Sequence, residues 1–475
     1  MASEGIQRRP GVCGAESVYG ILPGMANASP DQPSRGEWTF RSAPLAPDAA
    51  AGRAGADGSL LLSLPSPRAC GWWECEIALP PGGGVRLRAE ARVALGPGEA
   101  AVYNDLAMLV TWYDPAHGAR KGVPFLRRDF VHCADEGAAR VFDETFAVPD
   151  GCREARVEIV AKWHRMDVEI RGFAAEPAEP PPPRVVRCVV ANPHERKATD
   201  WRNEGTAAAD AGWEDPAAVV AARLARMEAC LDRIAAELPR PDLVLFAELF
   251  ADTGTPCPER TAERVPGGPS FALASRWAAA HRCHVAMNVR ERTDAGTFHN
   301  TTFVADRAGR LAGVYRKATL TSGEYMSGIL PGDDFGVIDL DFGRVGCLTC
   351  WDNWFSETAK YLRRKGAELL LFPLAGGADD HMDLVFPARS IDTGLPTLLA
   401  TRQGHLPSGI VGRDGAWIAR TLEDGGFAWA DVDLAARRRT WWLSVGPGEG
   451  DPYELYLDEG RPALYERQDL RRPRI

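Results

Sequence analysis

Apolar and polar residues alternate along the first part of the chain, between about residues 36 and 173. A period of two residues places successive side chains on opposite faces of a strand, so each run is expected to have one buried and one solvated face. Breaks rich in Gly, Pro and Asp separate the runs, as at 80–84 and 149–151, and helical spacing does not occur between them. The pattern predicts an antiparallel β-sandwich. Its clearest apolar positions are Val85, Leu87, Ala89, Ala91, Val93, Ala155, Val157, Ile159, Ala161, Trp163, Met166, Val168 and Ile170.

The pattern changes after residue 184, where short, fully apolar runs alternate with runs of helical spacing. One helix is expected to open at Asp215 and Pro216, an N-cap and first-turn pair, and to continue to Leu238. Buried strands that alternate with helices are typical of an α/β domain whose helices cover a sheet. The further elements expected are strands 243–247, 284–288, 337–340, 345–349, 369–373 and 397–401, a hairpin over 300–316, and helices 270–280, 355–365 and 387–393.

A proline-rich segment, 174–183, separates the two patterns. Its five prolines remove backbone donors and favour an extended, semi-rigid spacer. The sequence therefore predicts an N-terminal extension, 1–35, a β-sandwich domain, 36–173, this linker, and an α/β domain, 184–475. Two domains agree with a length of 475 residues, which exceeds one core of ordinary size.

Composition narrows the class of protein. The net charge is -10 and no block of Lys or Arg stands out, which argues against nucleic acid as a partner. Neither a membrane-spanning stretch nor the apolar run of a signal peptide is evident, so we expect a soluble, cytoplasmic protein with no membrane partner. The 11 cysteines are odd in number and lack the spacing of a disulfide framework, so reduced thiols are expected.

Cys350 ends the apolar run 345–349 and precedes a short turn and a helix. A thiol at such a turn can lie at the mouth of a site, with the backbone N–H of Trp351 free to bind an oxyanion. A cysteine can equally be a small buried hydrophobe, which is the better interpretation for Cys347. The spacing of Cys347 and Cys350 also admits a redox pair or half of a zinc site, although no second Cys-x-x-Cys is present.

A nucleophilic thiol needs a base and a cation nearby. Glu248 follows an apolar strand directly, so its carboxylate lies either in solvent or at the floor of a pocket. Lys317 ends the expected hairpin, where the adjacent Arg316 also fits a solvated basic pair. Glu324, in the Gly/Ser-rich loop 321–328, supplies a second carboxylate. Each of these residues also has an ordinary surface interpretation.

Together these motifs resemble the nitrilase superfamily of carbon–nitrogen hydrolases over 184–475: Glu-Leu at Glu248, Tyr-Arg-Lys at Lys317, and Cys-Trp-Asp-Asn-Trp-Phe-Ser-Glu from Cys350. The order of the motifs supports the resemblance more strongly than any one of them. Further matching segments are 265–278, 299–304, 331–350 and 388–392.

The resemblance implies a four-layer αββα sandwich and a catalytic triad of Glu248, Lys317 and Cys350. In that scheme Glu248 accepts the thiol proton, Cys350 attacks the carbonyl carbon, and Lys317 with the Trp351 amide stabilises the tetrahedral intermediate. Glu324 matches a second glutamate that positions substrate and lysine. Water then hydrolyses the thioester, and neither a metal nor an organic cofactor is required.

Two positions depart from nitrilases proper: Thr319 replaces a histidine, and Trp351-Asp352 replaces a Trp-Glu pair. Asp352 followed by Phe355 and Glu357 is more similar to amidases and carbamoylases, although the proline usual between Phe355 and Glu357 is Ser356 here. We therefore expect hydrolysis of an amide or N-carbamoyl substrate, releasing ammonia or an amine and a carboxylic acid. The alternatives are acyl transfer to an amine, nitrile hydrolysis, or a catalytically silent sugar-binding scaffold.

Substrate contacts are less defined than the triad. The family commonly dimerises and builds larger assemblies, so the resemblance also implies a homo-oligomer. His381 and Arg389 fit a role behind the site or in packing as well as a substrate contact. The candidate substrate-binding residues are Tyr325, Trp351, Trp354, His381 and Arg389.

The first domain resembles, more loosely, the jelly-roll modules related to carbohydrate-binding domains. Aromatic side chains can form a platform for a sugar ring, although most Trp residues of a β-sandwich pack in its core. Trp72 and Trp73 are adjacent, so one of the two is expected to face outward. The candidate aromatic residues are Trp72, Trp73, Trp112, Tyr113 and Trp163.

Overall fold

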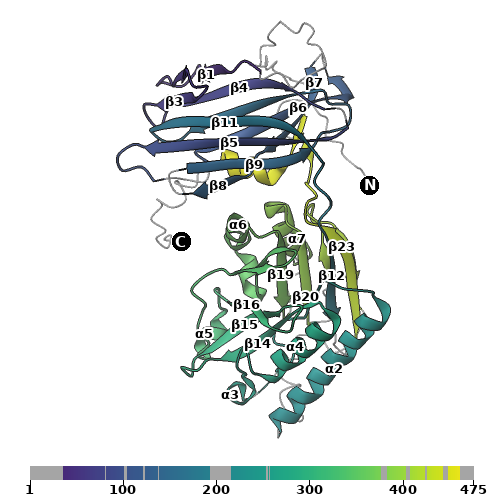
Figure 1. The fold of residues 1–475 in the computed structure, drawn as a ribbon. Helices are drawn as coiled ribbons and strands as arrows, with labels where there is room; N and C mark the ends of the chain where they lie inside the picture. Colours follow the sequence, from purple (N-terminus) through teal and green to yellow (C-terminus); the bar gives the residue numbers. More distant parts are fainter. Residues whose placement is uncertain are drawn as a thin grey trace, which may run out of the picture.

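The computed structural model describes residues 36–80, 82–100, 104–120, 123–136, 139–192, 215–252, 255, 257–375, 382–402, 407–422, 425–441 and 448–460. In Figure 1 the purple and blue strands of the first part form one body, and the green part with its helices forms another. Each body contains two β-sheets that pack face to face. The two bodies correspond to the two hydrophobic patterns of the sequence.

The first body is a β-sandwich in which antiparallel pairing prevails. One sheet has the order β1-β4-β10-β6-β7 and continues into the C-terminal strands, and the other has the order β2-β3-β11-β5-β9-β8. The predicted alternating positions form the shared core, except that Trp163 lies beyond the end of β10 at a φ of 74°. The strands are β1 (Thr39–Ser42), β2 (Ala51–Ala54), β3 (Leu60–Leu64), β4 (Cys70–Ala78), β5 (Gly84–Leu95), β6 (Leu106–Arg120), β7 (Val123–Phe130), β8 (Cys133–Glu136), β9 (Ala139–Ala147), β10 (Glu154–Lys162) and β11 (Met166–Ala178).

The boundary between the bodies differs from the expected linker at 174–183. β11 continues through Ala178, with Pro177 opposite Val85 of β5. Pairing of β11 with β3 ends at Ile170, so among the described strands the last part of β11 pairs with β5 alone. A proline is tolerated there because one side of the strand needs no backbone donor.

The end of the chain returns to the first sandwich, which the sequence did not predict. β24 (Thr440–Trp441) and β25 (Gly448–Gly450) extend its first sheet, with β25 parallel to β7. The helix α8 (Pro452–Glu459) follows, and Asn104 Nδ2 donates to the carbonyl oxygen of Leu457 at 2.8 Å. Figure 1 shows these yellow elements against the blue strands. The C-terminal segment therefore ties the two bodies together.

The second body has two six-stranded sheets, of order β16-β15-β14-β13-β12-β23 and β17-β18-β19-β20-β21-β22. In each sheet three adjacent strands run parallel, namely β12, β13 and β14 in one and β18, β19 and β20 in the other. An apolar core fills the space between the sheets, α2 and α4 pack on one outer face, and α6 and α7 pack on the other. This gives four layers in the order αββα.

The strands of the second body are β12 (Val185–Asn192), β13 (Leu243–Leu245), β14 (His284–Arg292), β15 (Phe298–Ala305), β16 (Leu311–Arg316), β17 (Val337–Leu340), β18 (Gly343–Cys347), β19 (Leu369–Leu374), β20 (Thr397–Thr401), β21 (Ser408–Val411), β22 (Trp417–Thr421) and β23 (Gly426–Asp433). The helices are α2 (Pro216–Glu237), α3 (Pro258–Thr261), α4 (Pro269–His281), α5 (Ser322–Met326), α6 (Ser356–Arg364) and α7 (Met382–Thr393). None of the described helices has the length and apolar character needed to cross a bilayer.

Local sequence explains how these helices begin. Asp215 caps α2 as expected, because its side chain accepts hydrogen bonds from the backbone N–H groups of Ala217 and Ala218. The expected start of α7 at Pro387 is wrong, since the helix begins at Met382 and contains Pro387. A proline in the first turn and one inside a kinked helix cannot be told apart from residue type alone.

Candidate active site

Glu248 lies just beyond β13 and is 2% exposed, which excludes the interpretation of a solvated strand-end acid. Its Oε1 accepts hydrogen bonds from Asn300 Nδ2 at 2.7 Å and from Lys317 Nζ at 3.2 Å. Its Oε2 accepts one from the backbone N–H of Ala375 at 2.8 Å. A buried carboxylate is costly unless it is paired and hydrogen-bonded, and here both oxygens have partners.

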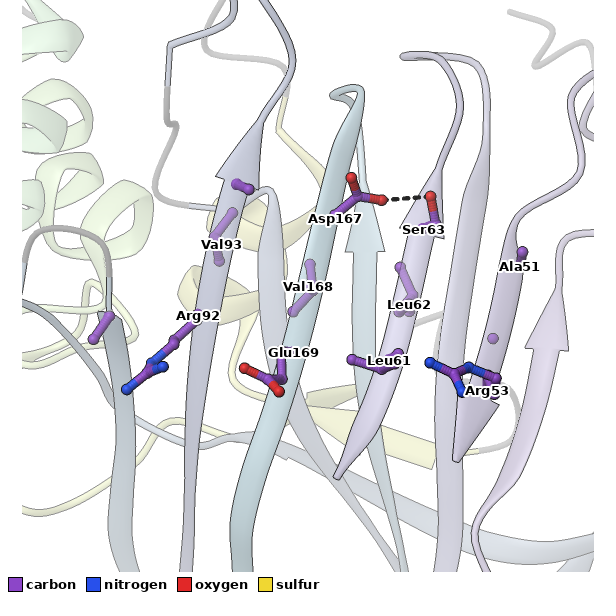
Figure 2. Close-up of a pocket in the computed structure, with 13 residues that line it drawn as sticks. Ala51, Arg53, Leu61, Leu62, Ser63, Arg92, Val93, Asp167, Val168 and Glu169 are labelled. Carbon is purple, nitrogen blue, oxygen red and sulfur yellow. Dashed lines mark hydrogen bonds between the residues drawn. The ribbon is translucent and has the colours of Figure 1, made fainter. Parts of the chain in front are cut away.

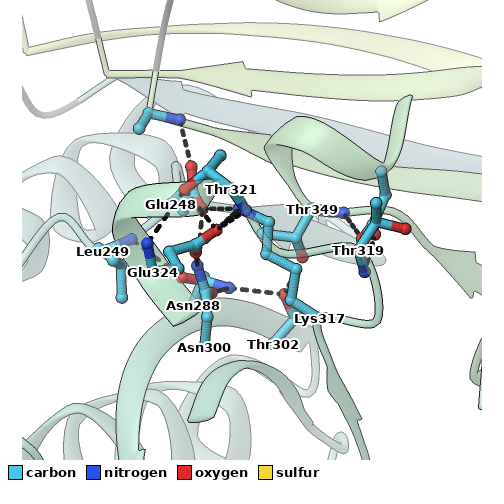
Figure 3. A network of polar contacts seen from close by, with 12 residues as sticks. Glu248, Leu249, Asn288, Asn300, Thr302, Lys317, Thr319, Thr321, Glu324 and Thr349 are labelled. Carbon is cyan, nitrogen blue, oxygen red and sulfur yellow. Dashed lines mark hydrogen bonds and ion pairs between the residues drawn. The ribbon is translucent and has the colours of Figure 1, made fainter. Parts of the chain in front are cut away.

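Lys317 is 1% exposed and lies between two carboxylates. Its Nζ is 2.9 Å from each oxygen of Glu324 and 3.2 Å from Glu248 Oε1 (Figure 3). Burial lowers the pKa of Lys317, but the charges of Glu248, the Cys350 sulfur and Glu324 outweigh burial and raise that pKa overall. Burial raises the pKa of Glu324, but Lys317 outweighs it and lowers that pKa overall. Both groups are therefore charged near neutral pH.

Glu324 belongs to the short helix α5, where the sequence suggested a loop. The Thr321 hydroxyl accepts a hydrogen bond from the Glu324 backbone N–H, and Glu324 Oε2 accepts one from the Thr321 N–H at 2.8 Å. This capping box fixes the first turn of the helix. The same carboxylate thus closes a helix end and pairs with Lys317, which determines its position.

Cys350 begins the 3-10 turn η1 (Cys350–Trp354) after β18 and is half-buried. Its φ of 48° lies in the left-handed region, which residues other than glycine rarely adopt and which is frequent at functional sites. Burial and the charge of Glu248 raise the pKa of Cys350, although Lys317 opposes this. The thiol is therefore protonated at neutral pH and needs a base, and Glu248 is a carboxylate whose charge acts on it.

A buried pair that the sequence did not reveal connects the lysine segment to the cysteine turn. Tyr315 donates its hydroxyl to Asp352 Oδ2 at 2.6 Å, and Asp352 Oδ1 accepts the Thr319 N–H at 2.8 Å. Asp352 Oδ2 also accepts the Thr349 N–H at 2.9 Å, one residue before Cys350. Burial raises the pKa of Asp352, which these three hydrogen bonds oppose. The pair fixes two segments of the site relative to each other.

Asn288 and Asn300 were also missed as site residues. Asn300 Nδ2 contacts Glu324 Oε1 at 2.9 Å as well as Glu248, and Asn288 Nδ2 contacts Asn300 Oδ1 at 2.9 Å. The available signal was the presence of amide side chains in two strands, β14, where Asn288 lies between Met287 and Val289, and β15, where Asn300 lies among other buried residues. A buried amide in such a strand needs polar partners, which the site provides.

The candidate substrate-binding residues occupy different places. Trp351 is 39% exposed and its ring centroid lies 6.0 Å from that of Trp354. Tyr325, next to Glu324 in α5, is 59% exposed. Arg389 is buried in α7 and lies 3.0 Å from Asp392 of the same helix. The remaining candidate, His381, lies outside the described residues.

The candidate aromatic residues of the first sandwich do not form one platform. Trp112 and Trp73 are buried in the core, while Trp72 is half-buried on the opposite face of β4, as expected for adjacent residues. The Trp72 ring N–H donates to Glu74 at 2.9 Å. Tyr113 and Trp163 are half-buried as well.

A groove of about 720 Å³ lies instead on the outer face of the other sheet of this sandwich (Figure 2). It crosses β2, β3, β11, β5 and the start of β9, and one row of outward residues runs Arg53, Leu61, Glu169, Arg92. The neighbouring row contains small side chains, which leaves the hollow. The lining residues are Ala51, Gly52, Arg53, Leu61, Leu62, Ser63, Arg92, Val93, Ala94, Ala139, Asp167, Val168 and Glu169.

Within the part of the chain that the structure describes, no cluster of three or more His, Cys, Asp or Glu is placed to hold a metal ion. The arrangement at the strand ends is a thiol, two carboxylates and a cation that pairs with both of them. These groups can perform proton transfer and nucleophilic attack. The four-layer fold and this set of groups describe an α/β enzyme with its site at the strand ends.

Comparisons with known proteins identify the family. The chain matches the model of the carbon-nitrogen hydrolase family over residues 206–440. A protein of Schizosaccharomyces pombe described as a probable nitrilase is 30% identical over 188 residues, which cover 38% of this chain and 68% of that protein. N-carbamoylputrescine amidase of Arabidopsis thaliana is 31% identical over 196 residues, or 34% of this chain and 66% of the relative. The carbon-nitrogen hydrolase of Helicobacter pylori G27 aligns with a TM-score of 0.44 at 20% identity, covering 60% of this chain and 96% of that one.

The chain therefore belongs to the carbon–nitrogen hydrolase family. It is a hydrolase of the amidase type, and the resemblance to the nitrilase superfamily drawn from the motifs is confirmed.

Proposed function

We propose that the chain hydrolyses an amide or N-carbamoyl group through a thioester on Cys350. The observation that carries this proposal is the contact of Lys317 with both Glu248 and Glu324, while the charges of Glu248 and Lys317 both act on the Cys350 thiol. A single cation between two carboxylates, beside a thiol that needs a base, suits acyl transfer to sulfur.

In the proposed reaction Glu248 accepts the thiol proton as the Cys350 sulfur attacks the carbonyl carbon. The negative charge that develops on the carbonyl oxygen is stabilised by Lys317 and by the Trp351 backbone N–H. Glu248 then gives the proton to the departing nitrogen, and ammonia or an amine leaves. Water loses a proton to the same carboxylate, attacks the thioester and releases the carboxylic acid, and Cys350 regains its proton.

Two observations favour amide or carbamoyl substrates over nitriles. The relative from Arabidopsis thaliana is named as an N-carbamoylputrescine amidase, and a relative from Homo sapiens, 27% identical over 197 residues, as an omega-amidase. Thr319, where nitrilases proper carry a histidine, donates its backbone N–H to Asp352 and so helps to hold the lysine segment. Tyr325, Trp351 and Trp354 remain the proposed substrate contacts, and a homo-oligomer remains a prediction.

A substrate panel with two cysteine variants tests this function. Primary amides, N-carbamoyl compounds and nitriles are incubated with the wild type, Cys350→Ala and Cys347→Ala, and ammonia and product mass are measured. Cys347 is a matched control because it is fully buried in β18, three residues from Cys350.

We expect turnover of an amide or carbamoyl compound by the wild type, retained activity in Cys347→Ala, and loss to background in Cys350→Ala. Turnover by Cys350→Ala would exclude the thioester mechanism. Turnover of nitriles alone would exclude the proposed substrate class, and a new amide formed without the free acid would indicate acyl transfer instead.

A further inference from the structure

Asn300, in β15, contacts both carboxylates of the site through its side chain and the backbone of Lys317 through its carbonyl oxygen. Its Nδ2 donates to Glu248 Oε1 at 2.7 Å and to Glu324 Oε1 at 2.9 Å. Its backbone carbonyl oxygen accepts the Lys317 N–H at 2.8 Å. The residue is 2% exposed, so both amide hydrogens are directed at the carboxylates with little competition from water.

A chain of hydrogen bonds fixes which way the Asn300 amide faces. The backbone N–H of Leu249, which can only donate, bonds to Asn288 Oδ1 at 3.0 Å. Asn288 Nδ2 must then be the donor to Asn300 Oδ1 at 2.9 Å and to Thr302 Oγ1 at 2.9 Å. With Asn300 Oδ1 used as an acceptor, its NH₂ group faces the two carboxylates, as Figure 3 shows. An amide in the opposite orientation would place an oxygen against two negative charges.

The series of hydrogen bonds through Asn288 and Asn300 begins and ends at the Glu248–Leu249 segment. Leu249 follows Glu248 and has a φ of 46°, a strained conformation for leucine that the bond to Asn288 helps to hold. The backbone after Glu248 is therefore fixed by Asn288, and the carboxylate of Glu248 is fixed by Asn300. With Lys317 on Oε1 and the Ala375 N–H on Oε2, both oxygens of the Glu248 side chain have fixed partners.

We propose that Asn300, oriented by Asn288, is a positioning residue for carbon–nitrogen hydrolysis: it holds the Glu248 carboxylate in the orientation that accepts the Cys350 proton, and holds Glu324 against Lys317. This inference rests on the proposed function of Glu248 and Cys350. In this proposal the side-chain amides of Asn300 and Asn288 carry no charge and transfer no proton. Their role is to align the charged groups that take part in the reaction.

Asn300→Asp is the most informative variant, because it keeps the shape of the side chain and replaces the NH₂ donor by an oxygen. We expect kcat to fall by ~100-fold or more at about pH 8, with KM changed by less than about threefold, as for loss of a donor to a reacting group. The introduced carboxyl group lies beside two carboxylates, which raises its pKa. As the pH falls it takes up a proton and regains one donor, so the ratio of variant to wild-type kcat should rise toward about pH 6.

Asn288→Asp tests the orienting step without changing any group that touches a carboxylate of the site. It still accepts the Leu249 N–H but no longer donates to Asn300, so we expect a smaller loss of kcat, about tenfold, again with little change in KM. This variant keeps the inference testable if Asn300→Asp does not fold.

Asn104→Asp is the matched control. Asn104 is 3% exposed, and its Nδ2 donates to three carbonyl oxygens at the C-terminal segment, in the first sandwich. The control should lower the unfolding temperature while leaving kcat and its pH profile unchanged, because it creates a buried carboxylate away from Cys350.

The rate at which iodoacetamide alkylates Cys350, followed by peptide mass, gives a readout that does not need a substrate. Asn300→Asp should slow alkylation at about pH 8, because the added negative charge raises the thiol pKa, whereas Asn104→Asp should not. A folded Asn300→Asp variant with kcat within threefold of the wild type, or a loss of kcat that is the same at every pH, would overturn the inference. Failure of the proposed function would appear separately, as turnover that survives Cys350→Ala.

Discussion

The two sandwiches of this chain have equally apolar cores but keep their polar groups in different places. In the first, buried ionisable groups such as Asp105 with Arg140 and Asp129 with Arg439 pair with opposite charges, and the hollow lies on an outer face. In the second, Glu248, Lys317, Glu324 and the Cys350 thiol meet at the ends of strands.

Strand direction explains the difference. β13 is parallel to β12 and β14, and β18 and β19 are parallel to each other, so the residues that follow them meet at the same edge of the two sheets. In a sheet of parallel strands this carboxyl edge is where sites form. Antiparallel strands, which make up most of the first sandwich, alternate in direction and collect no such set. The comparison teaches that strand direction, rather than core composition, locates the chemistry of this molecule.

The largest expected effect comes from removing the base, with Glu248→Gln. Turnover should fall by about 10²- to 10⁴-fold, the usual contribution of a general base. Alkylation of Cys350 by iodoacetamide at about pH 8 should instead become faster, because Glu248 raises the thiol pKa and its charge is gone, so more thiolate is present.

These two changes of opposite sign separate a base from a residue that merely supports the fold. If Glu248→Gln remained folded but slowed both turnover and alkylation, the charge of Glu248 would not set the pKa of the Cys350 thiol. The contrast drawn between the two sandwiches would then fail, because the polar groups of the second would not act on one another.

An intermediate effect is expected from Tyr315→Phe, which removes the hydroxyl that donates to Asp352 at 2.6 Å. The buried carboxylate loses one of its donors, at a cost of about 1–3 kcal/mol, and the lysine and cysteine segments lose a connection. We expect kcat to fall by about tenfold and the unfolding temperature to drop, measured by kinetics and thermal denaturation. Tyr361→Phe, at a tyrosine that is 44% exposed, is the control and should change neither. Equal effects of the two substitutions would contradict the role given to the Tyr315–Asp352 pair.

The sequence revealed the site where the signal was local. Glu248 and Cys350 follow apolar runs and Lys317 ends an expected hairpin, so their places at strand ends could be predicted from adjacent residues. The bonds of Asn300 to Glu248 and of Tyr315 to Asp352 join residues 52 and 37 positions apart. The first depends on the strand order β13-β14-β15 within one sheet, and the second depends on how the two sheets face each other. No local pattern encodes either arrangement.

The fold also has parts that local sequence predicted and parts that it did not. Alternation predicted the first sandwich, and the αββα layering implied by the resemblance matches the second. The return of β25 to β7 was not predicted, because a three-residue strand containing two glycines has no alternating signal. The helical start of α7 was missed because Pro387 resembles a first-turn residue.

The smallest effect is expected from the groove of the first sandwich. Replacing Arg53 and Arg92 by Ala together should change turnover by less than about twofold and the free energy of unfolding by about 0.5 kcal/mol or less per site, because both lie on the exposed face of the sheet. A loss of turnover above tenfold would show that the first sandwich contributes to the chemistry.

The double variant of Arg53 and Arg92 also tests carbohydrate binding, which stays a prediction for this sandwich. The groove offers a hollow that the aromatic residues do not, so a glycan bound by the full chain on an array should be released by the double substitution. Binding that survives the substitution would assign the sugar to another surface, such as that of Trp72.

The most direct test of the central claim is to trap the acyl group on the protein. The wild type is mixed with a substrate found in the panel, quenched in acid during turnover, digested, and examined by peptide mass. The account predicts an acyl adduct on the peptide that contains Cys350, at the mass of the substrate minus its amine, and none on Cys350→Ala. Continued turnover with no adduct, or with the adduct on another cysteine, would contradict it.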